Sequence, residues 1–419
     1  MSLNNPVYWI WLQQVFGAGS QKPLLAAEKF GGPAGVYDAS EYDRRLTDLF
    51  SANDLARMAA QDLTRAEFAV KSCARIGYRI VTPDDAGYPR RLRRIDSPPA
   101  ALYIHGLLPD VDDEVLVAIV GTRSATPFGL KAASLLASRL AKAGAVVVSG
   151  GALGVDSASH KGALQAGGRT VAVLGCGLDY PYLRENEDLR KVIARNGALV
   201  SEHPPGAAPT KQCFPIRNRL ISGLCLGTVI IEASAKSGSL ITANLALEQG
   251  RDVFVVPGNA LSPAYTGSNR LLHDGAKPVF SALDVLEEYA SQYPHRLDLR
   301  RADVPLGDRE PRLEEFALPP KMITKLAKAQ DKDYPPPAAK KITPSAAEKS
   351  TEPRSFTPPP DTLSAHAKAL LGGFVAPAMQ LDALLRASGL AVSDGMRAVT
   401  ELEFAGVLET LPGRMVRRI

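Results

Sequence analysis

The sequence is short of closely spaced cysteines. Its four cysteines, Cys73, Cys176, Cys213 and Cys225, form no Cys-x-x-Cys pair. Structural zinc sites and small disulfide-rich folds both depend on such spacing. We therefore expect reduced thiols, no bound metal and a cytoplasmic chain.

Long apolar runs are also missing from the 419 residues. A helix needs about 20 consecutive apolar residues to span a bilayer, and no segment approaches that length. Residues 7–12 are apolar but too few for the core of a signal peptide, and no Lys or Arg precedes them. The sequence therefore predicts no membrane partner.

Two nucleotide-binding fingerprints are absent. A dinucleotide site would place Gly-x-Gly-x-x-Gly directly after the first strand of its sheet. Residues 121–126 occupy that place here and read Gly-Thr-Arg-Ser-Ala-Thr. The phosphate-binding pattern Gly-x-x-x-x-Gly-Lys-Ser/Thr occurs nowhere in the sequence. We expect neither NAD nor any other cofactor.

The sequence also lacks a recognisable catalytic set. Asp156, His160, Glu202 and Glu232 fall near the ends of predicted loops, but no serine stands in a nucleophile elbow. The sequence also shows no pair of carboxylates together with a histidine that could bind a metal. We expect a protein that is not an enzyme, and a Rossmann-like enzyme acting on a nucleotide or small molecule is the alternative.

What the sequence does contain is an ordinary globular composition with a modest positive charge. Hydrophobic residues make up 45% and charged residues 22%, which is typical of a folded soluble chain. The net charge is +5 and the isoelectric point about 8.9. Such a balance permits an acidic partner without requiring one, so the positions of the cations matter more than their sum.

Periodicity and composition divide the chain into four parts. Residues 1–80 are predicted to form short helices, in which residues 15–20 resemble the phosphate-approaching turn of a helix–hairpin–helix motif. The alternative is a helical bundle with ordinary glycine caps. Residues 293–360 are rich in Pro, Lys and Ala and are predicted to be a linker. Residues 361–419 show three helices and a hairpin, the pattern of a winged helix.

The remaining part, residues 81–292, alternates apolar β-rich runs with helices. Apolar runs without alternation, separated by helices, indicate a parallel sheet covered on both faces. Right-handed crossovers then make an α/β, doubly wound, Rossmann-like domain. The predicted strands are 115–120, 145–148, 170–174, 198–201, 228–231 and 252–256. The predicted helices are 130–143, 155–165, 186–195, 216–224 and 240–249.

Ligands of such sheets bind beyond the carboxyl ends of the strands, where the strand order switches. The loops at those ends are rich in glycine and small hydroxyl residues, which allow a phosphate to approach the backbone closely. These loops are residues 121–124, 149–154, 175–177, 201–214 and 232–238. The sequence therefore places a phosphate-binding site along this edge of the sheet.

Residues 211–223 are the strongest candidate within these loops. Pro215 suits the start of a helix, so we expect a helix to begin there and Phe214 to close the preceding loop. The free N–H groups of a helix start attract anions.

Cations cluster around this predicted helix start. Phosphate contacts would come from Arg123, Lys211, Arg217 and Arg219, and a base platform from Phe214, as single-stranded DNA requires. The alternatives are surface ion pairs for the arginines and a core position for Phe214.

Six motifs follow one another through the central part of the sequence. They are Ala118-Ile-Val-Gly-Thr-Arg123; Ser149-Gly150 with Gly154-Val-Asp156; Ala172-Val-Leu-Gly-Cys-Gly-Leu-Asp179; Phe214-Pro-Ile-Arg-Asn-Arg-Leu-Ile-Ser-Gly223; Ser237-Gly-Ser-Leu-Ile-Thr242; and Val256-Pro-Gly258 with Gly267-Ser-Asn269. In this order they resemble the DNA-processing protein DprA family, also called Smf. The resemblance is strong over residues 115–280 and looser over the N-terminal helices.

The resemblance implies a bacterial, non-enzymatic protein that binds single-stranded DNA during natural transformation. Members of the family protect incoming strands and help to load the RecA recombinase on them, as homodimers formed through the Rossmann-like domain. The N-terminal part resembles the family's SAM-like helical domain. In the C-terminal winged helix, Arg397 is the one cation on the presumed recognition helix, which favours a protein-contact module over a DNA-reading one.

The resemblance also implies which residues form the DNA site. Carried over position by position, they are Arg123, Ser149, Gly150, Gly151, Lys211, Phe214, Arg217 and Asn218. Gly151 departs from the family pattern, which often has a large apolar residue after Ser-Gly.

Overall fold

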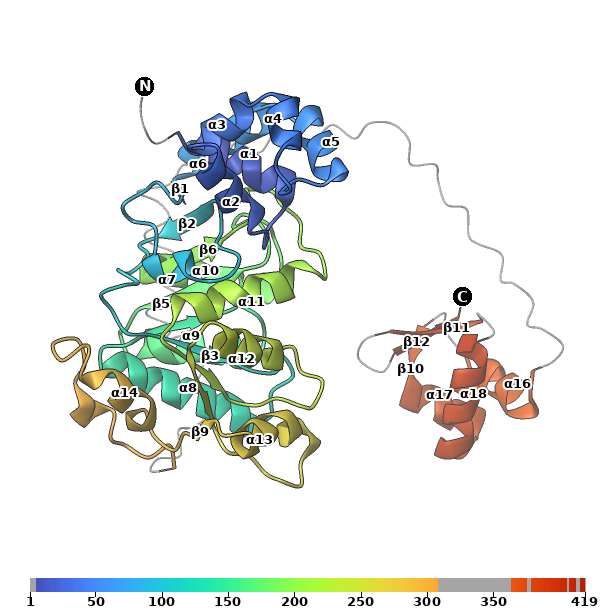
Figure 1. The fold of residues 1–419 in the computed structure, drawn as a ribbon. Helices are drawn as coiled ribbons and strands as arrows, with labels where there is room; N and C mark the ends of the chain where they lie inside the picture. Colours follow the sequence, from blue (N-terminus) through green and yellow to red (C-terminus); the bar gives the residue numbers. More distant parts are fainter. Residues whose placement is uncertain (1–4, 308–362, 375–377, 405–406, 412–414, 419) are drawn as a thin grey trace. The chain divides into compact units, whose positions relative to one another are not determined.

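The structure is a computed structural model that describes residues 5–307, 363–374, 378–404, 407–411 and 415–418 (Figure 1). The chain divides into two compact units, Met1–Pro335 and Pro336–Ile419. None of the described helices is long and apolar enough to cross a membrane.

The first unit begins with a group of short helices. Helix α1 is the centre of this group, because Trp9, Ile10 and Trp11 are buried in it. The helices are α1 (Pro6–Phe16), α2 (Lys22–Lys29), α3 (Pro33–Asp38), α4 (Glu41–Arg45), α5 (Ala52–Ala60) and α6 (Thr64–Ile76). Figure 1 shows them in blue, gathered at one end of the sheet.

A nine-stranded sheet forms the centre of the unit within the described residues. Its spatial order is β1-β2-β6-β5-β4-β3-β7-β8-β9. The strands are β1 (Arg79–Val81), β2 (Leu102–Gly106), β3 (Leu116–Val120), β4 (Val146–Ser149), β5 (Thr170–Leu174), β6 (Gly197–Ser201), β7 (Gly227–Ile230), β8 (Asp252–Val255) and β9 (Lys277–Pro278). Strands β3 to β9 are parallel, and β1 and β2 are antiparallel additions at one edge. The α/β parallel-sheet prediction is confirmed.

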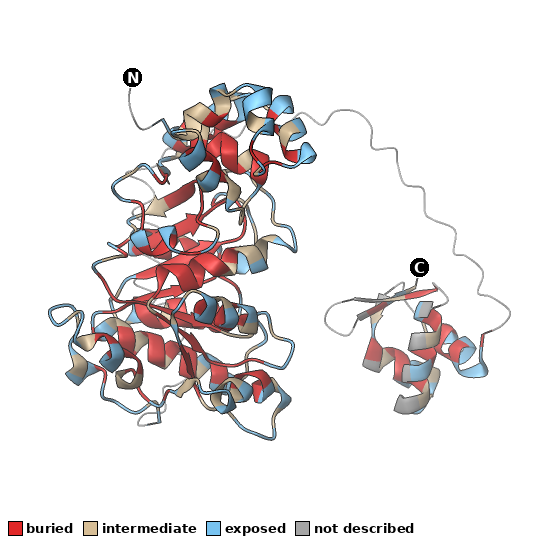
Figure 2. Ribbon diagram, viewed as in Figure 1, coloured by how far each residue is buried: buried red, intermediate tan, exposed pale blue. Residues whose placement is uncertain are grey.

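Helices cover both faces of this sheet. The covering helices are α8 (Pro127–Lys142), α9 (Val155–Gln165), α10 (Glu187–Arg195), α11 (Cys213–Leu224), α12 (Ser239–Glu248), α13 (Thr266–His273) and α14 (Leu283–Ala290). Along β3, Leu116 and Ala118 face the core made with α11 and α12, whereas Val117 faces the core made with α8 and α14. Both faces of the strand are therefore apolar, which is why its sequence does not alternate. Figure 2 shows the buried layer continuing through the strands.

The compact unit extends beyond residue 292, where the sequence places the start of the linker. Leu297, Leu299 and Leu306 pack against the core made with α8 and α14. The Asp298 N–H also donates to the Ala143 carbonyl, at 2.9 Å. The greater part of the predicted linker, residues 308–360, lies outside the described residues.

Among the residues of the second unit that the structure describes are three helices and a small sheet. They are α16 (Ala365–Gly372), α17 (Leu381–Ser388), α18 (Val392–Phe404), β10 (Ala378–Gln380), β11 (Leu408–Leu411) and β12 (Met415–Arg418), and the strand order is β10-β12-β11. Leu370, Leu384 and Leu402 from the three helices pack with Val416 of β12 in one core. This is the predicted winged helix, with β10 as a strand that the sequence analysis did not predict.

Candidate nucleic-acid interface

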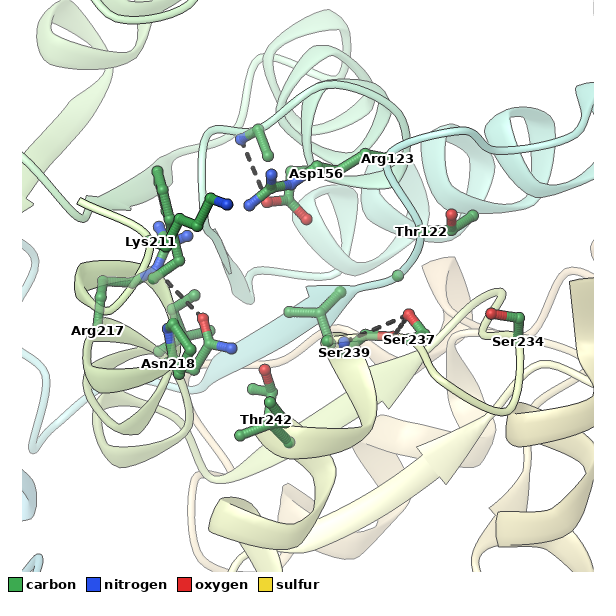
Figure 3. Close-up of a pocket in the computed structure, with 18 residues that line it drawn as sticks. Thr122, Arg123, Asp156, Lys211, Arg217, Asn218, Ser234, Ser237, Ser239 and Thr242 are labelled. Carbon is green, nitrogen blue, oxygen red and sulfur yellow. Dashed lines mark hydrogen bonds between the residues drawn. The ribbon is translucent and has the colours of Figure 1, made fainter. Parts of the chain in front are cut away.

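A cavity of about 530 Å³ opens beyond the carboxyl ends of the parallel strands. It lies where the strand order switches, because β4 and β7 flank β3 on opposite sides. Its walls come from the loop after β3, from the start of α9, from α11 and from the loop that leads into α12 (Figure 3). The loops of the sequence predict a site at this edge of the sheet.

Two exposed cations line the cavity from different elements. Arg123 belongs to the loop after β3, and Lys211 precedes α11. Figure 3 shows both side chains reaching toward the same region. Exposed cations that meet over a cavity are suited to bind a phosphate, because they lose little hydration until the anion arrives.

A buried carboxylate holds the loop that carries Arg123. Glu232 accepts a hydrogen bond from the Thr126 hydroxyl at 2.9 Å, and its own backbone carbonyl accepts one from Thr122 N–H at 2.9 Å. Thr126 in turn caps α8 by accepting from Gly129 N–H at 3.1 Å. Contacts at Thr122 and Thr126, on either side of Arg123 in the sequence, therefore position the loop that carries Arg123.

Arg217 lines the cavity but is 6% exposed. Its guanidinium donates to the Gly150 carbonyl at 2.6 Å and also to the Val173 carbonyl. Burial lowers the pKa of Arg217, and the nearby Asp156 carboxylate opposes that shift. Because its donors are used inside the protein, Arg217 positions the loop after β4 more than it offers charge to a ligand.

Asp156 is the carboxylate of the cavity wall. It accepts a hydrogen bond from the Ala152 N–H at 3.2 Å and is almost fully buried. Burial raises the pKa of Asp156, and Arg217 opposes this shift. Asp156 and Arg217 are both buried, which leaves Arg123 and Lys211 as the exposed cations of the wall.

The structure places Ser149, Gly150 and Gly151 behind the cavity wall. The Ser149 hydroxyl donates to the Ile119 carbonyl at 2.7 Å. Gly151 has φ +67°, and a Cβ there would lie 2.9 Å from a methyl group of Leu174. The departure from the family pattern at this position therefore has a local reason, since the conformation and the space both favour glycine.

The prediction that a helix begins at Pro215 was wrong. Helix α11 begins at Cys213, so Phe214 lies inside its first turn and Pro215 is the third helical residue. Proline is tolerated there because the first N–H groups of a helix have no partner within it.

The Phe214 ring is already in contact with two side chains. It lies 5.0 Å from the Arg123 guanidinium carbon and 5.4 Å from the Tyr182 ring. A base would stack on Phe214 only after Arg123 moves, or would stack on the guanidinium itself. The predicted base platform therefore involves Arg123 as well as Phe214.

Arg219 does not line the cavity. It is 7% exposed, and its guanidinium is bonded to the Glu202 carboxylate. Asn218, between the two arginines, does line the cavity, and its Oδ1 accepts from Arg217 Nε at 3.3 Å. Of the neighbouring predicted contacts on α11, Asn218 is therefore the one placed to meet a ligand.

One wall of the cavity was not in the predicted site. It consists of hydroxyl groups from the loop after β7 and from α12, namely Ser234, Ser237, Ser239 and Thr242. The sequence did contain a signal, because the 237–242 motif follows a strand end. Uncharged hydroxyl groups do not indicate one class of ligand, so the motif by itself predicts no role for these residues.

His160, a hydrolase candidate in the sequence, lies fully buried on α9. The Thr170 hydroxyl donates to the Val147 carbonyl at 2.7 Å, so His160 Nδ1 donates to the Thr170 oxygen at 2.7 Å. Burial lowers the pKa of His160 to about 3, with a smaller contribution from Arg217. Within the described ranges, no group of three His, Cys, Asp or Glu residues could hold a metal ion.

Both units of the chain are similar to known proteins. The family model for "DNA recombination-mediator protein A" matches residues 79–290. Protein Smf of Synechocystis sp. (strain ATCC 27184 / PCC 6803 / Kazusa) is 30% identical over 423 residues, covering 100% of both chains. The chain belongs to the DprA/Smf family. The predicted family is confirmed.

Other DprA/Smf proteins agree with this placement. DNA processing protein DprA of Bacillus subtilis (strain 168) is 43% identical over 201 residues, which cover 48% of this chain and 68% of that one. The X-ray structure of DprA from Streptococcus pneumoniae is 34% identical with a TM-score of 0.60, covering 69% of this chain and 99% of that one. The DprA winged helix domain matches residues 354–414, which confirms the predicted winged helix.

The winged helix of this DprA/Smf chain has an acidic third helix, α18. On α18, Arg397 is exposed, while the same helix carries Asp394, Glu401 and Glu403. A helix that enters a DNA groove meets phosphates on both sides and needs more cations than carboxylates. That the winged helix is a protein-contact module stays a prediction, and the excess of carboxylates on α18 agrees with it.

Proposed function

We propose that this chain binds single-stranded DNA in the cavity beyond β3 and β7 and protects strands that enter the cell during natural transformation. One observation carries the proposal: Arg123 and Lys211, both exposed, converge on a cavity at the switch point of the sheet. Family membership agrees with a role in DNA processing.

The cavity favours an unpaired strand over a duplex. Its volume of about 530 Å³ is that of a small-ligand pocket. Such a space accepts one or a few nucleotides whose bases are free to enter, whereas a double helix keeps its bases stacked inside. Two cations and the Phe214 ring beside them supply the contacts that unpaired strands use.

We further propose that the protein acts without catalysing a reaction, in the cytoplasm, as a homodimer that loads the RecA recombinase on the bound strand. These statements rest on the family resemblance. Light scattering of the purified chain tests the dimer. The rate of RecA assembly on a strand coated with single-strand-binding protein, with and without this protein, tests the loading.

The central experiment compares ligands for the purified full chain. Fluorescence anisotropy measures the affinity for a labelled single strand, for a duplex of equal length, and for the single strand in competition with nucleotides and NAD. We expect tight binding of the single strand and weak competition by free nucleotides. Tight binding of a nucleotide together with weak binding of DNA would favour the alternative, a Rossmann-like enzyme.

A further inference from the structure

Four arginines gather on a short helix outside the cavity. Helix α7 (Arg90–Arg93) and the residue after it read Arg-Arg-Leu-Arg-Arg, at positions 90–94. None of these five residues lines the cavity. A run of like charges is usually a solvated surface, so a function can be argued only from the partners of each side chain.

Helix α7 lies against α11, at the end of α11 that is farther from the cavity (Figure 1). Gly223 allows this contact, because a Cβ there would lie 3.0 Å from side-chain carbons of Leu92 and Ile95. Helix α11 has 12 residues and is therefore about 18 Å long. Because α11 leads into β7, the arginines lie near the amino ends of the parallel strands, at the edge of the sheet opposite the cavity.

Arg91 of this run is a structural residue. It is buried, and its guanidinium donates to the Leu224 carbonyl at 3.3 Å and to the Glu114 carbonyl at 2.9 Å. It also donates to the Tyr293 hydroxyl at 2.8 Å. These contacts tie α7 to the residues that precede β7 and β3, so the position of the run is fixed.

The exposed arginines of the run differ in their partners. Arg90 Nε lies 3.4 Å from a carboxylate oxygen of Asp112, and the Arg93 guanidinium donates to the Pro83 carbonyl. The Arg94 side chain is exposed and makes no hydrogen bond or ion pair with any residue that the structure describes. Arg94 is therefore the member of the run that is free to bind an anion.

Arg251 joins this group from another part of the chain. It immediately precedes β8, whose first residue donates its N–H to the Leu226 carbonyl at 3.3 Å, two positions from the Leu224 carbonyl that Arg91 reaches. The Nε atom of Arg251 is buried and has no partner among the described residues. Burial lowers the pKa of Arg251, and the positive charges of Arg91 and Arg94 lower it further. Three guanidinium groups therefore lie close enough to repel one another.

The ends of the neighbouring helices account for Arg91 but not for Arg251. A cation is favoured at the C-terminus of a helix, where it meets free carbonyls, and Arg91 does so at Leu224. Arg251 Nε donates to no carbonyl, and the adjacent Asp252 carboxylate accepts from the Tyr289 hydroxyl at 2.7 Å. No ion pair links Arg251 to a carboxylate anywhere in the described part of the chain. A half-buried cation without a counter-charge is costly, so an anion that arrives from solvent is favoured.

We infer that Arg94 and Arg251 form a second phosphate site, at the edge of the sheet opposite the cavity, which binds the backbone of a single strand that extends past the cavity. The inference rests on the proposed binding of single-stranded DNA. Arginine binds phosphate well, because its planar guanidinium offers several donors and is weakly hydrated. Phosphate contacts carry no sequence information, so the site adds affinity for any strand that is long enough to reach it.

Strand length separates the two sites. Labelled oligo(dT) of about 4 and of about 16 nucleotides, the range of site sizes in single-strand-binding folds, is titrated with the full chain by anisotropy. Arg94→Gln combined with Arg251→Gln removes two phosphate contacts. We expect this double variant to bind the long strand about tenfold more weakly at about 0.1 M salt, and the slope of log affinity against log salt to flatten by roughly 1.4. Its affinity for the short strand should be unchanged.

The matched control also removes two exposed positive charges. Lys142→Gln and Arg195→Gln lie on α8 and α10, which pack with α9 on the face of the sheet opposite α11. Their combination should change neither affinity. The urea midpoint of the double variant should not fall, because its substitutions remove repulsion; a fall would show that Arg251 is a structural contact and contradict the inference. If that variant does not fold, Arg94→Gln alone should give about half of the change in slope.

The remaining outcomes distinguish the two proposals. An unchanged affinity of the double variant for the long strand, or an equal loss for both lengths, would overturn the second site while the cavity stands. Calorimetry with inorganic phosphate tests another source of the anion. Phosphate binding that the double variant loses, with its long-strand affinity unchanged, would assign the site to a free phosphate and overturn the strand contact. Weak binding of both lengths by the unmodified protein would instead contradict the proposed function.

Discussion

Arg219 and Glu202 form a buried ion pair between α11 and the end of β6. Arg219 Nη2 lies 2.6 Å from Oε1 and 2.5 Å from Oε2 of the carboxylate. The same Oε1 accepts a hydrogen bond from Gly19 N–H at 3.3 Å, and the Gln13 side chain donates to the Glu202 backbone carbonyl. The glycine turn that the sequence suggested for a phosphate therefore approaches a carboxylate of its own chain, and this links the N-terminal helices to α11, the helix beside the cavity.

We predict that Arg219→Met detaches the N-terminal helices. Removing one partner of a buried ion pair leaves an uncompensated charge, which costs about 3–5 kcal/mol. Trp9 and Trp11 are the two tryptophans of the chain and both lie in α1, so the midpoint of urea unfolding followed by tryptophan fluorescence should fall.

The same variant tests the direct role that the sequence assigned to Arg219. If the residue acts only in packing, the salt dependence of DNA binding keeps its slope in the folded variant. Arg195→Met, at an exposed arginine on α10, is the control and should change neither quantity. A flatter salt dependence with unchanged unfolding would restore the DNA contact.

The exposed cations should determine the salt dependence of binding. Arg123→Ala and Lys211→Ala each remove one phosphate contact, so each should flatten the slope of log affinity against log salt by roughly 0.7. The double variant should lose most single-strand binding while its circular dichroism is unchanged. Lys142→Ala removes an exposed charge near the end of α8, outside the cavity, and should keep the original slope.

Phe214→Ala should weaken binding of every sequence to a similar extent. Loss of a stacked base contributes about 1–3 kcal/mol, and the ring has no hydrogen-bonding group with which to choose a base. Affinities for oligo(dT), oligo(dC) and oligo(dA) in parallel titrations measure this. A loss confined to one base would indicate sequence readout and contradict stacking.

Acid should destabilise the sheet unit through His160. Burial lowers the pKa of His160 to about 3 in the folded state, while the unfolded residue titrates near its ordinary value of about 6.5. As the pH falls below about 6.5, the unfolded chain takes up a proton that the folded chain does not. Stability is therefore present above that pH and is lost toward pH 3, by up to about 1.4 kcal/mol per pH unit.

Urea midpoints at pH 7.5 and pH 5.5 measure this loss. His160→Asn keeps a donor for the Thr170 hydroxyl and should make the midpoint less dependent on pH. His295→Asn, at an exposed histidine, should leave the dependence as it was. An equal pH dependence in all three proteins would contradict the buried neutral histidine.

Much of the sheet could be predicted from local sequence. Each of the six parallel strands that were predicted is found within one or two residues of its expected bounds, because an apolar run between two helices has few alternatives to a buried strand. The edge of the sheet that holds the cavity followed from the same pattern, since the carboxyl ends of parallel strands share one edge. Arg123 and Lys211 followed from it as well, because both stand in loops at that edge.

The roles of Arg217 and Arg219 could not be predicted in this way. The two lie two positions apart on one helix and therefore point about 200° away from each other. The rotation of α11 on the sheet determines that Arg217 meets the Gly150 and Val173 carbonyls and that Arg219 meets Glu202. That rotation depends on apolar packing of α11 against strands from elsewhere in the chain.

By itself, the sequence determined the doubly wound sheet, the winged helix, the family and the edge of the sheet that holds the cavity, because these depend on patterns within short segments. The tertiary structure decided which polar groups of that edge are free. Glu202, Glu232 and the Gly150 carbonyl each meet their partners across long stretches of sequence. A polar group is available to a ligand only where no such partner reaches it, and for that reason only the folded chain separates Arg123 and Lys211 from Arg217 and Arg219.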